Sequence, residues 1–386
     1  MFLKKMIERN NKLIETSFQL HQAGKILPDS YVVDMDVLLE NAKAILEEGN
    51  KNHIDQYFML KQLGRNPIIA QELIKLGYKG AVVVDFKEAL VMMQHNIPIC
   101  NVGHLVQMPK QMVQELVDYG CEYFTVFSLD KIKEINEAAK NSNRIQKLLL
   151  KVVGKDDMIY SGQTAGFRLE ELKDVVEQIK KLENVRIEGV TSFPCFLYDE
   201  NEEKIKSTNN LNTLLSAKEI LKNEGIEVKN VNAPSATSVF TIKEMGKYPV
   251  NSAEPGHGLT GTTPMHAKKN CVECPCVLYL SELSHNFDGH AYCYGGGHYR
   301  RSHVANALVG KNLNDAKMVS IIPPTDESID YYFEIPETCE ISDTVIMAFR
   351  FQIFVTRSQV VLVKGISTNT PQIMGIYNSL GDEITR

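Results

Sequence analysis

The chain has 386 residues, which is too long for one small domain and suggests about two or three. Hydrophobic residues make up 44%, charged residues 23%, and the net charge is −6 without a long lysine–arginine run, so a basic nucleic-acid-binding surface is not expected. The charged N-terminal stretch lacks the apolar core of a signal peptide, and no window approaches the ~18 apolar residues of a membrane span. We therefore expect a cytoplasmic protein with no membrane partner.

Apolar residues at helical spacing predict one amphipathic helix over residues 1–27, closed by Pro28 and Asp29. A strand is predicted at 30–36 and a helix at 37–47. Short apolar strands then alternate with helical patterns. The predicted strands are 57–61, 80–85, 98–103, 123–128, 148–153, 187–193, 227–233 and 249–256, and the predicted helices are 68–77, 86–94, 109–119, 130–140, 169–182, 203–224 and 236–246.

Eight strands, each followed by a helix or a long loop, are typical of a (β/α)8 TIM barrel in the α/β class. Several strands are nearly continuous apolar runs, as expected for strands covered on both faces. The competing open, doubly wound sheet lacks support because no GxGxxG motif follows the first strand. After about residue 265, strand-like runs alternate with turns, which predicts a smaller all-β, barrel-like domain. The expected domains are a helical arm (1–29), the barrel (30–265) and the C-terminal β-domain (266–386).

The eight cysteines do not form the dense pattern of a disulfide-rich protein. Cys271, Cys274 and Cys276 cluster as CVECPC, a spacing that zinc or iron–sulfur sites also use. No second CxxC or histidine pair completes a ligand set, so we predict reduced thiols and no metal.

The stretch YFMLKQLGRNP (57–67) places Lys61 where a buried strand opens into a loop. In a barrel, the C-terminal ends of the strands carry the catalytic groups. Burial there favours the neutral, nucleophilic amine, which can form a Schiff base with an aldehyde cofactor. The alternative is a strand-end lysine that only extends its ammonium group to solvent.

Two loops after the last predicted barrel strands favour an anion. NAPSATS (232–238) brings the hydroxyls of Ser235, Thr237 or Ser238 to the start of a helix. EPGHGLTGTTP (254–264) contains Gly256 and two more glycines, which permit turns that present backbone amides to a phosphate. The alternative is that the two loops provide only a helix cap and a turn.

A strand-end lysine combined with a phosphate site after strands 7 and 8 suggests pyridoxal 5'-phosphate. The cofactor also needs a partner for its pyridine nitrogen. Glu254 ends the last strand just before the second loop, and a carboxylate there would keep the ring nitrogen protonated.

With these residues in place, the chain resembles the fold-type III pyridoxal-phosphate enzymes, the superfamily of alanine racemases and basic amino-acid decarboxylases, and most closely its YhfX-type branch. The resemblance runs from YVVDMDVLLENAK to the C-terminal β-domain. It implies that Lys61 in FMLKQLGRNP carries the cofactor. AEPGH is similar to the AEPGR of the decarboxylases, which implies that Glu254 meets the pyridine nitrogen and that His257 replaces the arginine. Racemases have an arginine in place of the glutamate.

The resemblance also implies roles in the β-domain and in the loops. AYCYGGGHYRR (291–301) is similar to the racemase motif that carries a second acid–base tyrosine across the dimer interface, which assigns this role to Tyr294. Decarboxylases use a cysteine in this region, and Cys293 is adjacent. NAPSA implies a phosphate contact by Ser235. SGQTAGF lacks the racemase arginine that contacts the phenolic oxygen of the cofactor, so Gln163 or Thr164 is expected to replace it.

The resemblance implies a pyridoxal-phosphate-dependent racemase or epimerase that acts at the α-carbon of an amino acid, with Lys61 and Tyr294 as bases on opposite faces. Such a protein is a homodimer with shared active sites and a small-molecule amino-acid or amine substrate. Two alternatives stay open: a decarboxylase or other lyase of the same fold, and a non-catalytic carrier of the cofactor.

Overall fold

The computed structural model describes residues 2–385, so the first and last residues of the predicted terminal domains lie outside it. Contacts divide the chain into two compact units, and each unit is assembled from separate segments. The β unit contains residues 2–42, Lys61–Asn66 and 259–385, and the barrel unit contains Lys43–Leu60 and Pro67–Gly258.

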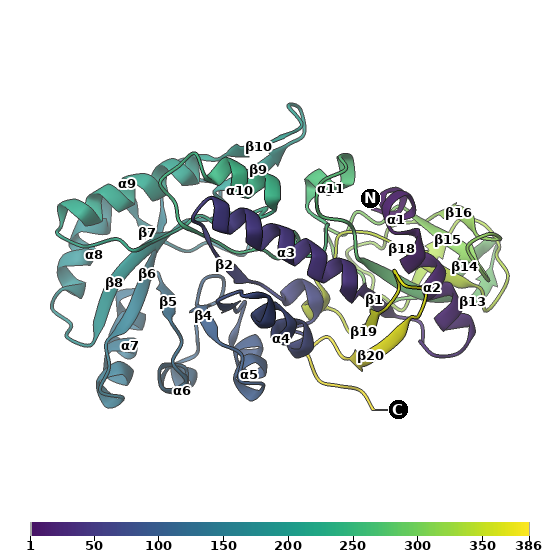
Figure 1. Cartoon of the computed structure of the whole chain (residues 1–386), viewed down its shortest axis with the longest axis horizontal. Coiled ribbons are helices and arrows are strands. Elements are labelled where there is room, and N and C mark those ends of the chain that lie inside the picture. The colour runs from purple at the N-terminus through teal and green to yellow at the C-terminus, as the bar shows by residue number, and fades with distance from the viewer. Residues whose placement is uncertain (1, 386) are drawn as a thin grey trace. The chain divides into compact units, whose positions relative to one another are not determined.

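Within the described residues, eight parallel strands close into a ring in the barrel unit (Figure 1). They are β2 (Asp55–Phe58), β3 (Gly80–Val82), β4 (Ile99–Val102), β5 (Tyr123–Val126), β6 (Gln146–Val153), β8 (Val185–Thr191), β11 (Asn230–Asn232) and β12 (Ser252–Ala253). The ring closes because β6 pairs with both β5 and β8, and β12 pairs with β2. The predicted TIM-like barrel followed by an all-β C-terminal domain is confirmed.

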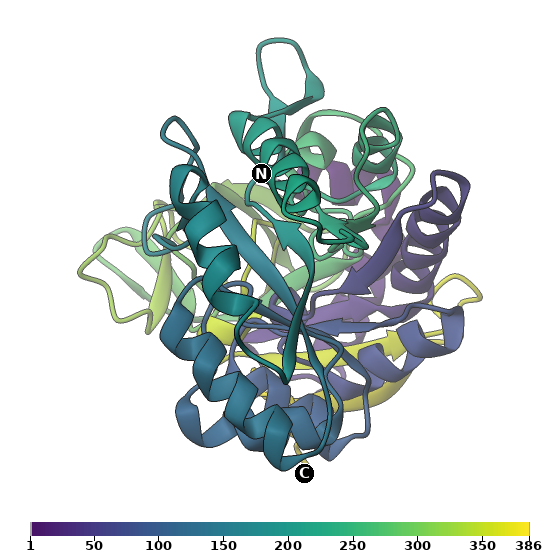
Figure 2. The same ribbon diagram turned by 90° about the vertical axis from the view of Figure 1, so that its left-hand side faces the viewer.

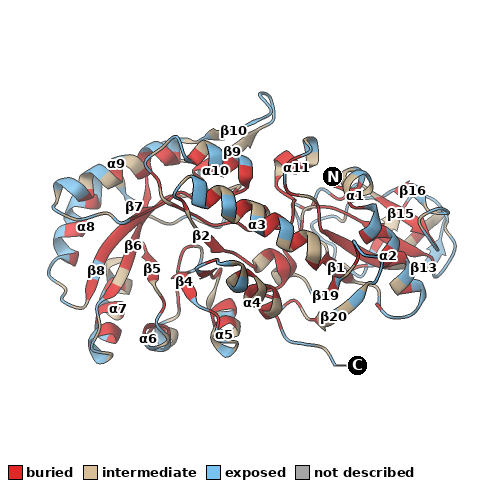
Figure 3. Ribbon diagram, in the orientation of Figure 1, coloured by how far each residue is buried: buried red, intermediate tan, exposed pale blue. Residues whose placement is uncertain are grey.

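Helices cover the outside of this ring, as the second view shows (Figure 2). They are α4 (Pro67–Leu76), α5 (Phe86–Gln94), α6 (Lys110–Tyr119), α7 (Leu129–Asn141), α8 (Leu172–Ile179), α9 (Asn209–Asn223) and α10 (Val239–Met245), while α3 (Met35–Lys51) runs from one unit into the other. These helices carry buried residues on one side and exposed residues on the other (Figure 3), as amphipathic surface helices do. Asp85, Ser128 and Ser238 start α5, α7 and α10, because their side-chain oxygens accept a hydrogen bond from the N–H three residues further on.

The β unit is organised around β1 (Ser30–Asp34), which is buried along its whole length. β1 pairs antiparallel with β13 (Val277–Phe287) and parallel with β19 (Gln359–Lys364), so an N-terminal strand lies in the middle of a sheet of C-terminal strands. The remaining strands are β14 (His290–Tyr294), β15 (Asn306–Gly310), β16 (Lys317–Ser320), β17 (Tyr332–Ile335), β18 (Thr344–Met347) and β20 (Gln372–Tyr377). Short helical segments accompany them: η1 (Lys61–Leu63), α11 (Pro264–Lys268) and η3 (Ile353–Val355).

The single helix predicted for residues 1–27 is wrong, because the chain forms α1 (Leu3–Arg9) and α2 (Asn11–Gln22). Asn10 breaks the helix with φ −143° and caps α2, accepting a hydrogen bond from the N–H of Leu13 at 3.3 Å. Its amide also donates to Asp34 at 3.2 Å. The helical periodicity survives the break because both helices pack apolar side chains against the same core, namely Leu3, Met6, Leu13, Ile14 and Phe18.

The helix predicted for 203–224 is also only partly correct. Its first residues form a hairpin of β9 (Phe196–Asp199) and β10 (Lys204–Ser207) before α9 begins at Asn209. Lys206 pairs with Asp199 across the hairpin at 3.0 Å, and Thr208, with an extended backbone, is the N-cap residue of α9. Two further short elements occur after β6: the strand β7 (Phe167–Arg168) and the turn η2 (Leu169–Glu171).

Candidate active site

Polar side chains inside the barrel unit lie at the C-terminal ends of its strands. Asn101 on β4 is fully buried and accepts a hydrogen bond from the hydroxyl of Thr125 on β5 at 2.8 Å. The Asn101 amide donates to Oε1 of Glu254, directly after β12, at 3.3 Å. A buried amide held by two partners has one orientation, so it fixes the position of the carboxylate.

A second buried network crosses the strands on the other side of the ring. The hydroxyl of Thr191 on β8 donates to Asn232 on β11 at 2.7 Å, and the Asn232 amide donates to Ser252 on β12 at 3.3 Å. Ser252 in turn donates to Asn230 at 2.5 Å, and Asn230 donates to the hydroxyl of Tyr57 on β2 at 3.2 Å. Polar side chains therefore occupy the barrel interior where an all-aliphatic core would give more stability, which is typical of a binding site.

Glu254 lies within this polar region, with 7% of its surface exposed. Besides Asn101, it faces His104, whose Nε2 is 3.7 Å from Oε2 of Glu254. The His104 ring meets Phe193, which follows β8, edge to face at 5.7 Å between centroids. The carboxylate predicted to meet the pyridine nitrogen is thus buried at the C-terminal end of the barrel and held from β4.

Lys151 brings an amine into the same region. It lies on β6 with 4% of its surface exposed, and its Nζ is 3.4 Å from the carbonyl oxygen of His104. Burial lowers the pKa of Lys151, while the charge of Glu254 acts in the opposite direction.

Gln163 lies in the long loop after β6, and this loop is held at two points. Asp157 accepts hydrogen bonds from the backbone N–H of Gly154 at 2.7 Å and from the hydroxyl of Thr213 at 2.9 Å. Asn210 exchanges two hydrogen bonds with the backbone of Met158, each of 3.1 Å. The loop therefore has a defined path.

Gln163 lines a small cavity at the end of β6, together with Lys151, Val152, Val153, Ile159, Tyr160, Ala165, Phe193 and Asn210. The side-chain oxygen of Gln163 is buried there and has no hydrogen-bond partner within the described residues. An acceptor in this condition is suited to a ligand that donates a hydrogen bond. Thr164, the other predicted substitute for the missing arginine, is exposed.

The NAPSATS loop has an unusual backbone. Ser235 and Ala236 both have positive φ values, 129° and 50°. Thr237 is buried, and its hydroxyl lacks a hydrogen-bond partner in the described part of the chain. Gly258, from the second predicted phosphate loop, approaches so closely that an added Cβ would lie 2.1 Å from the Thr237 carbonyl oxygen. Backbone strain next to an unsatisfied buried hydroxyl is a feature of ligand sites.

The second predicted loop starts at the Glu254 carboxylate. Gly256 is buried and His257 is half-buried. The carbonyl oxygen of Pro255 accepts a hydrogen bond from the N–H of Met59, just after β2, at 2.9 Å. The two predicted phosphate loops are neighbours, because Gly258 of the second loop lies against Thr237 of the first.

Lys61 follows β2 by three residues and opens the turn η1, which belongs to the β unit. Gly64 adopts a φ of 65°, and an added Cβ would lie 3.0 Å from Val360 and 3.2 Å from Ile353. The guanidinium of Arg65 lies over the Phe354 ring at 5.4 Å. The lysine loop is thus fixed by packing against η3 and β19.

Tyr294 and Cys293 are neighbours on β14 and point to opposite faces of the strand. Tyr294 is 38% exposed, and its ring lies 6.0 Å from that of Tyr332 on β17. Cys293 is fully buried, and burial raises the pKa of its thiol to about 12. At neutral pH this thiol is protonated and shielded, whereas the phenol is accessible.

The three glycines after Tyr294 have packing roles within the β unit. An added Cβ at Gly296 would lie 2.1 Å from a carboxylate oxygen of Asp29, and one at Gly297 would lie 2.2 Å from the Tyr279 ring. The carbonyl of Gly297 also accepts a hydrogen bond from Tyr31 at 2.6 Å. These contacts hold the turn tightly against the β unit.

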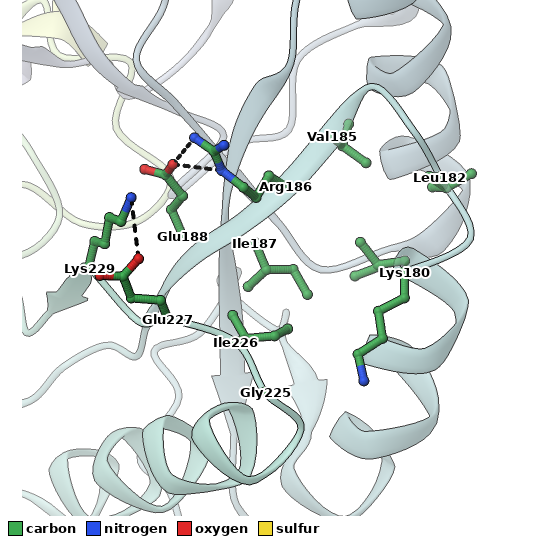
Figure 4. Close-up of a pocket in the computed structure, with 11 residues that line it drawn as sticks. Lys180, Leu182, Val185, Arg186, Ile187, Glu188, Gly225, Ile226, Glu227 and Lys229 are labelled. Atoms are coloured by element: carbon green, nitrogen blue, oxygen red, sulfur yellow. Dashed lines mark hydrogen bonds and ion pairs between the residues drawn. The ribbon is translucent and has the colours of Figure 1, made fainter.

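A different pocket lies at the N-terminal ends of the barrel strands (Figure 4). Its charged side chains pair with each other: Arg186 donates to Glu188, and Lys229 lies 3.6 Å from Glu227. None of the predicted site residues lines it. In (β/α)8 barrels this face serves stability, whereas the opposite face carries the chemistry.

The predicted residues are divided between the two units: Glu254, Ser235, Thr237, Gly256, His257 and Gln163 belong to the barrel unit, and Lys61, Tyr294 and Cys293 to the β unit. Reading only the strand ends indicated His104 but missed Asn101 and Lys151. The available signal for Lys151 was a single lysine inside the apolar run LLLKVV.

Among the described residues there is neither a cluster that could hold a metal ion nor a helix that could span a membrane. No group of three or more His, Cys, Asp or Glu side chains within residues 2–385 is arranged to hold a metal ion, and the CVECPC cysteines are free thiols. None of the helices in the described chain is both long enough and apolar enough to cross a membrane.

Comparison with known proteins identifies the class to which this barrel and site belong. Residues 33–264 match the family described as Alanine racemase, N-terminal domain, and residues 278–373 match the YhfX-like, C-terminal domain. The chain therefore belongs to the alanine racemase-like family and carries a YhfX-like C-terminal domain.

Individual relatives differ in how much they share. The Uncharacterized protein YhfX of Escherichia coli (strain K12) is 44% identical over 388 residues, which cover 100% of both chains. Alanine racemase of Clostridium novyi (strain NT) is 24% identical over 216 residues, covering 55% of this chain and 53% of the relative. The solved structure of D-threonine aldolase from Filomicrobium marinum has a TM-score of 0.66 at 15% identity, over 91% of this chain and 94% of its own, and indicates a shared fold.

Proposed function

We propose that the protein is a pyridoxal-phosphate-dependent amino-acid racemase or epimerase that acts at the α-carbon. The observation that supports this most strongly is the buried Glu254 carboxylate, held by Asn101 at the C-terminal end of the barrel. The chain is related to pyridoxal-phosphate-dependent enzymes, and members of the alanine racemase-like family use this cofactor.

The described residues fit the cofactor at three places. The buried, unpartnered hydroxyl of Thr237 suits a phosphate oxygen, with Ser235, Gly256 and His257 in the same pair of loops. Because α10 is only seven residues long, we assign phosphate binding to the loop atoms rather than to the helix dipole. Glu254 suits a pyridinium nitrogen, and the unpartnered oxygen of Gln163 suits a hydrogen-bond donor of the cofactor or substrate.

In this proposal, the amine of Lys61 anchors the cofactor covalently. When bound, pyridoxal phosphate withdraws electrons from the α-carbon of the substrate and weakens its bonds. The Glu254 carboxylate stabilises the positive charge on the ring nitrogen, which strengthens this withdrawal. The Lys61 amine moves a proton on one face of the α-carbon, and the Tyr294 phenol moves one on the other.

A homodimer with shared sites is part of the proposal, because Tyr294 is assigned to the site of the partner subunit. The exposure of Tyr294 supports this assignment, since a phenol that serves a neighbour must be accessible. The expectation of a cytoplasmic protein remains part of the same proposal.

A lyase reaction is the second candidate, and two fold neighbours favour it. The D-threonine aldolase structure is one, and D-threo-3-hydroxyaspartate dehydratase from Delftia sp. HT23, with a TM-score of 0.66 at 12% identity, is the other. A decarboxylase that uses Cys293 is less well supported, because this thiol is buried and its pKa is raised to about 12. A non-catalytic carrier of the cofactor is the third candidate.

The covalent assignment is tested by borohydride reduction of the purified protein with pyridoxal phosphate, followed by peptide mapping. We expect the phosphopyridoxyl label on Lys61. Lys151 is the informative competitor, because it is a buried lysine of the barrel unit. A label on Lys151 or on any other lysine contradicts the proposed site.

The reaction is tested with a panel of amino acids in deuterated water. A racemase exchanges the α-proton and interconverts enantiomers, a decarboxylase releases carbon dioxide, an aldolase releases an aldehyde, and a dehydratase forms a keto acid and ammonia. Tyr294→Phe should abolish racemisation while exchange from one enantiomer persists through Lys61. Tyr332→Phe removes a neighbouring exposed hydroxyl and is the matched control. Equal loss in both variants means that Tyr294 has no special role.

A further inference from the structure

Lys151 places an amine where its charged form is costly. It lies on β6 between buried apolar residues, and its side chain is 4% exposed. The free energy of moving an ammonium group out of water is large, and natural proteins offset it with a carboxylate or with an anionic ligand. A buried lysine therefore has a counter-charge, has a reduced proton affinity, or awaits a ligand.

No carboxylate of the described residues forms an ion pair with Lys151. Its Nζ contacts the carbonyl oxygen of His104 at 3.4 Å and lies 5.5 Å from the centre of the Phe127 ring. Both contacts are attractive to a cation, but neither carries a full negative charge. Glu254 acts on Lys151 only at longer range, and it faces Asn101 and His104 directly.

The surroundings of Lys151 are those of a ligand-facing group. The cavity at the end of β6 is lined by Lys151, the Gln163 amide, and the rings of Tyr160 and Phe193. The unpartnered oxygen of Gln163 is in the same lining, so the cavity presents a cation and an unsatisfied acceptor together. β6 is also the strand opposite β2 in the ring, since three strands separate them on either side within the described chain.

We propose that Lys151 binds an anionic oxygen of the ligand that occupies this end of the barrel. The inference rests on the proposed function and deepens it. Two sources supply such an oxygen: the phenolic oxygen of pyridoxal phosphate, and the carboxylate of the amino-acid substrate. Lys151 is the one residue with a charged side chain in the described lining of this cavity, so an anionic oxygen bound there would meet Lys151.

The test compares the full-length protein with Lys151→Met and with Lys147→Met. Methionine keeps the length and the apolar stem of lysine but removes the charge. Lys147 lies on the same strand, pairs with Glu122 at 3.4 Å, and takes no part in the proposed site. For each protein we would measure the melting temperature, the affinity for pyridoxal phosphate, the pH titration of its visible absorption band without substrate, and the affinities for an amino acid and for the amine that lacks its carboxylate.

If Lys151 binds the phenolic oxygen, Lys151→Met weakens cofactor binding about tenfold or more and shifts the titration of the visible band. If it binds the substrate carboxylate, cofactor affinity and spectrum stay unchanged, while affinity for the amino acid falls about tenfold and affinity for the amine does not. In both cases the melting temperature without cofactor stays the same or rises, because an unpaired buried charge has been removed.

Two results would overturn the proposal, and they distinguish failure of the Lys151 role from failure of the proposed function. If the wild-type protein binds pyridoxal phosphate and Lys151→Met matches it in spectrum and in all affinities, Lys151 is not a ligand-binding group and the proposed function stands. If the wild-type protein itself shows no cofactor absorption, the proposed function fails and the role of Lys151 fails with it.

Discussion

In the proposed function, the buried Glu254 carboxylate meets a positively charged ring nitrogen. Its oxygens face the Asn101 amide at 3.3 Å and the His104 ring at 3.7 Å, inside the barrel unit. These neighbours orient the carboxylate before any ligand arrives, which is how active sites reduce the cost of reorganisation.

We predict that Glu254→Gln keeps the fold and the cofactor but slows α-proton exchange. The amide can still accept the hydrogen bond from Asn101, whereas it cannot offset a charge on the ring nitrogen. A charge-assisted hydrogen bond contributes about 1.5–3 kcal/mol, so the exchange rate should fall roughly 10- to 150-fold. Exchange in deuterated water measures this, and an unchanged rate would show that Glu254 is structural.

Asp29 provides a pH-dependent test that is independent of catalysis. Its carboxylate accepts hydrogen bonds from the hydroxyls of Tyr279, at 2.8 Å, and Ser358, but burial dominates and raises its pKa to about 6. Because the folded state holds this proton more tightly than the unfolded state, the stabilising contribution is complete below about pH 4. It is lost as the pH rises through about 6.

Asp29→Asn should remove this dependence. Relative to the wild type, the variant should gain roughly 1–3 kcal/mol in free energy of unfolding between pH 4 and pH 8, from a shift of about two pKa units reduced for partial exposure. Urea unfolding at several pH values measures the difference. Asp156→Asn, at an exposed position, is the control, and a parallel pH profile for Asp29→Asn and the wild type would refute the prediction.

The sequence located the ends of the barrel strands well enough to select Glu254 and the Thr237 loop. It did not give the direction of side chains within the strands. Lys151 and Asn101 lie inside predicted strands, and only the register of the closed barrel shows that they point into the polar region. Cys293 and Tyr294 illustrate the same limit, because a shift of one residue in the pairing register of their strand would bury Tyr294 and expose Cys293.

At the scale of elements, local signals predicted the outer helices best. The predicted helix 86–94 matches α5 because Asp85 caps its start and a turn at Asn96 ends its pattern. The helices that failed, 1–27 and 203–224, were interrupted by tertiary contacts of Asn10 and by pairing in the β9–β10 hairpin. Apolar periodicity continues across such breaks and does not reveal them.

The packing of the lysine loop requires a glycine at position 64. Matched alanine substitutions at Gly64 and Gly24 measure how much this packing contributes to stability. Gly64 and Gly24 have nearly the same φ, 65° and 66°, but a Cβ at Gly64 would press on Val360 and Ile353, whereas a Cβ at Gly24 meets nothing within 4 Å. At both positions, alanine in the left-handed backbone conformation destabilises the fold by about 1–2 kcal/mol. Gly64→Ala should lose about 1–3 kcal/mol more, as overpacked sites do, and should also weaken cofactor binding.

Thermal and urea unfolding of the two variants, with cofactor titrations, test this expectation. The difference in free energy of unfolding between the two variants measures the cost of the Cβ contacts at Gly64, because the backbone cost is the same at both positions. Equal stabilities would mean that the loop shifts without cost, and that its packing against η3 and β19 does not fix Lys61.

For the whole molecule, the two compact units do not follow a simple cut of the chain. The sheet of the β unit contains β1, which pairs with β13 on one side and β19 on the other. We predict that a fragment of residues 266–386 alone does not fold, because removing a central strand leaves two edges with unpaired, apolar surfaces.

Circular dichroism and size-exclusion chromatography of this fragment test the prediction. Addition of a peptide of residues 25–36, which supplies β1, should partly restore a compact, soluble form. A fragment that is monomeric and folds cooperatively without the peptide would contradict the central role of β1.

The position of β1 also has a consequence for protein synthesis. β1 leaves the ribosome more than two hundred residues before β13 and β19, and in the meantime its hydrogen-bonding edges have no native partner. The barrel, whose strands follow one another closely in the chain, can assemble during this interval, whereas the sheet of the β unit must wait until translation is nearly complete. An apolar strand near the start of the nascent chain therefore stays without its native partners during this interval, and slow translation of the barrel segment would prolong it.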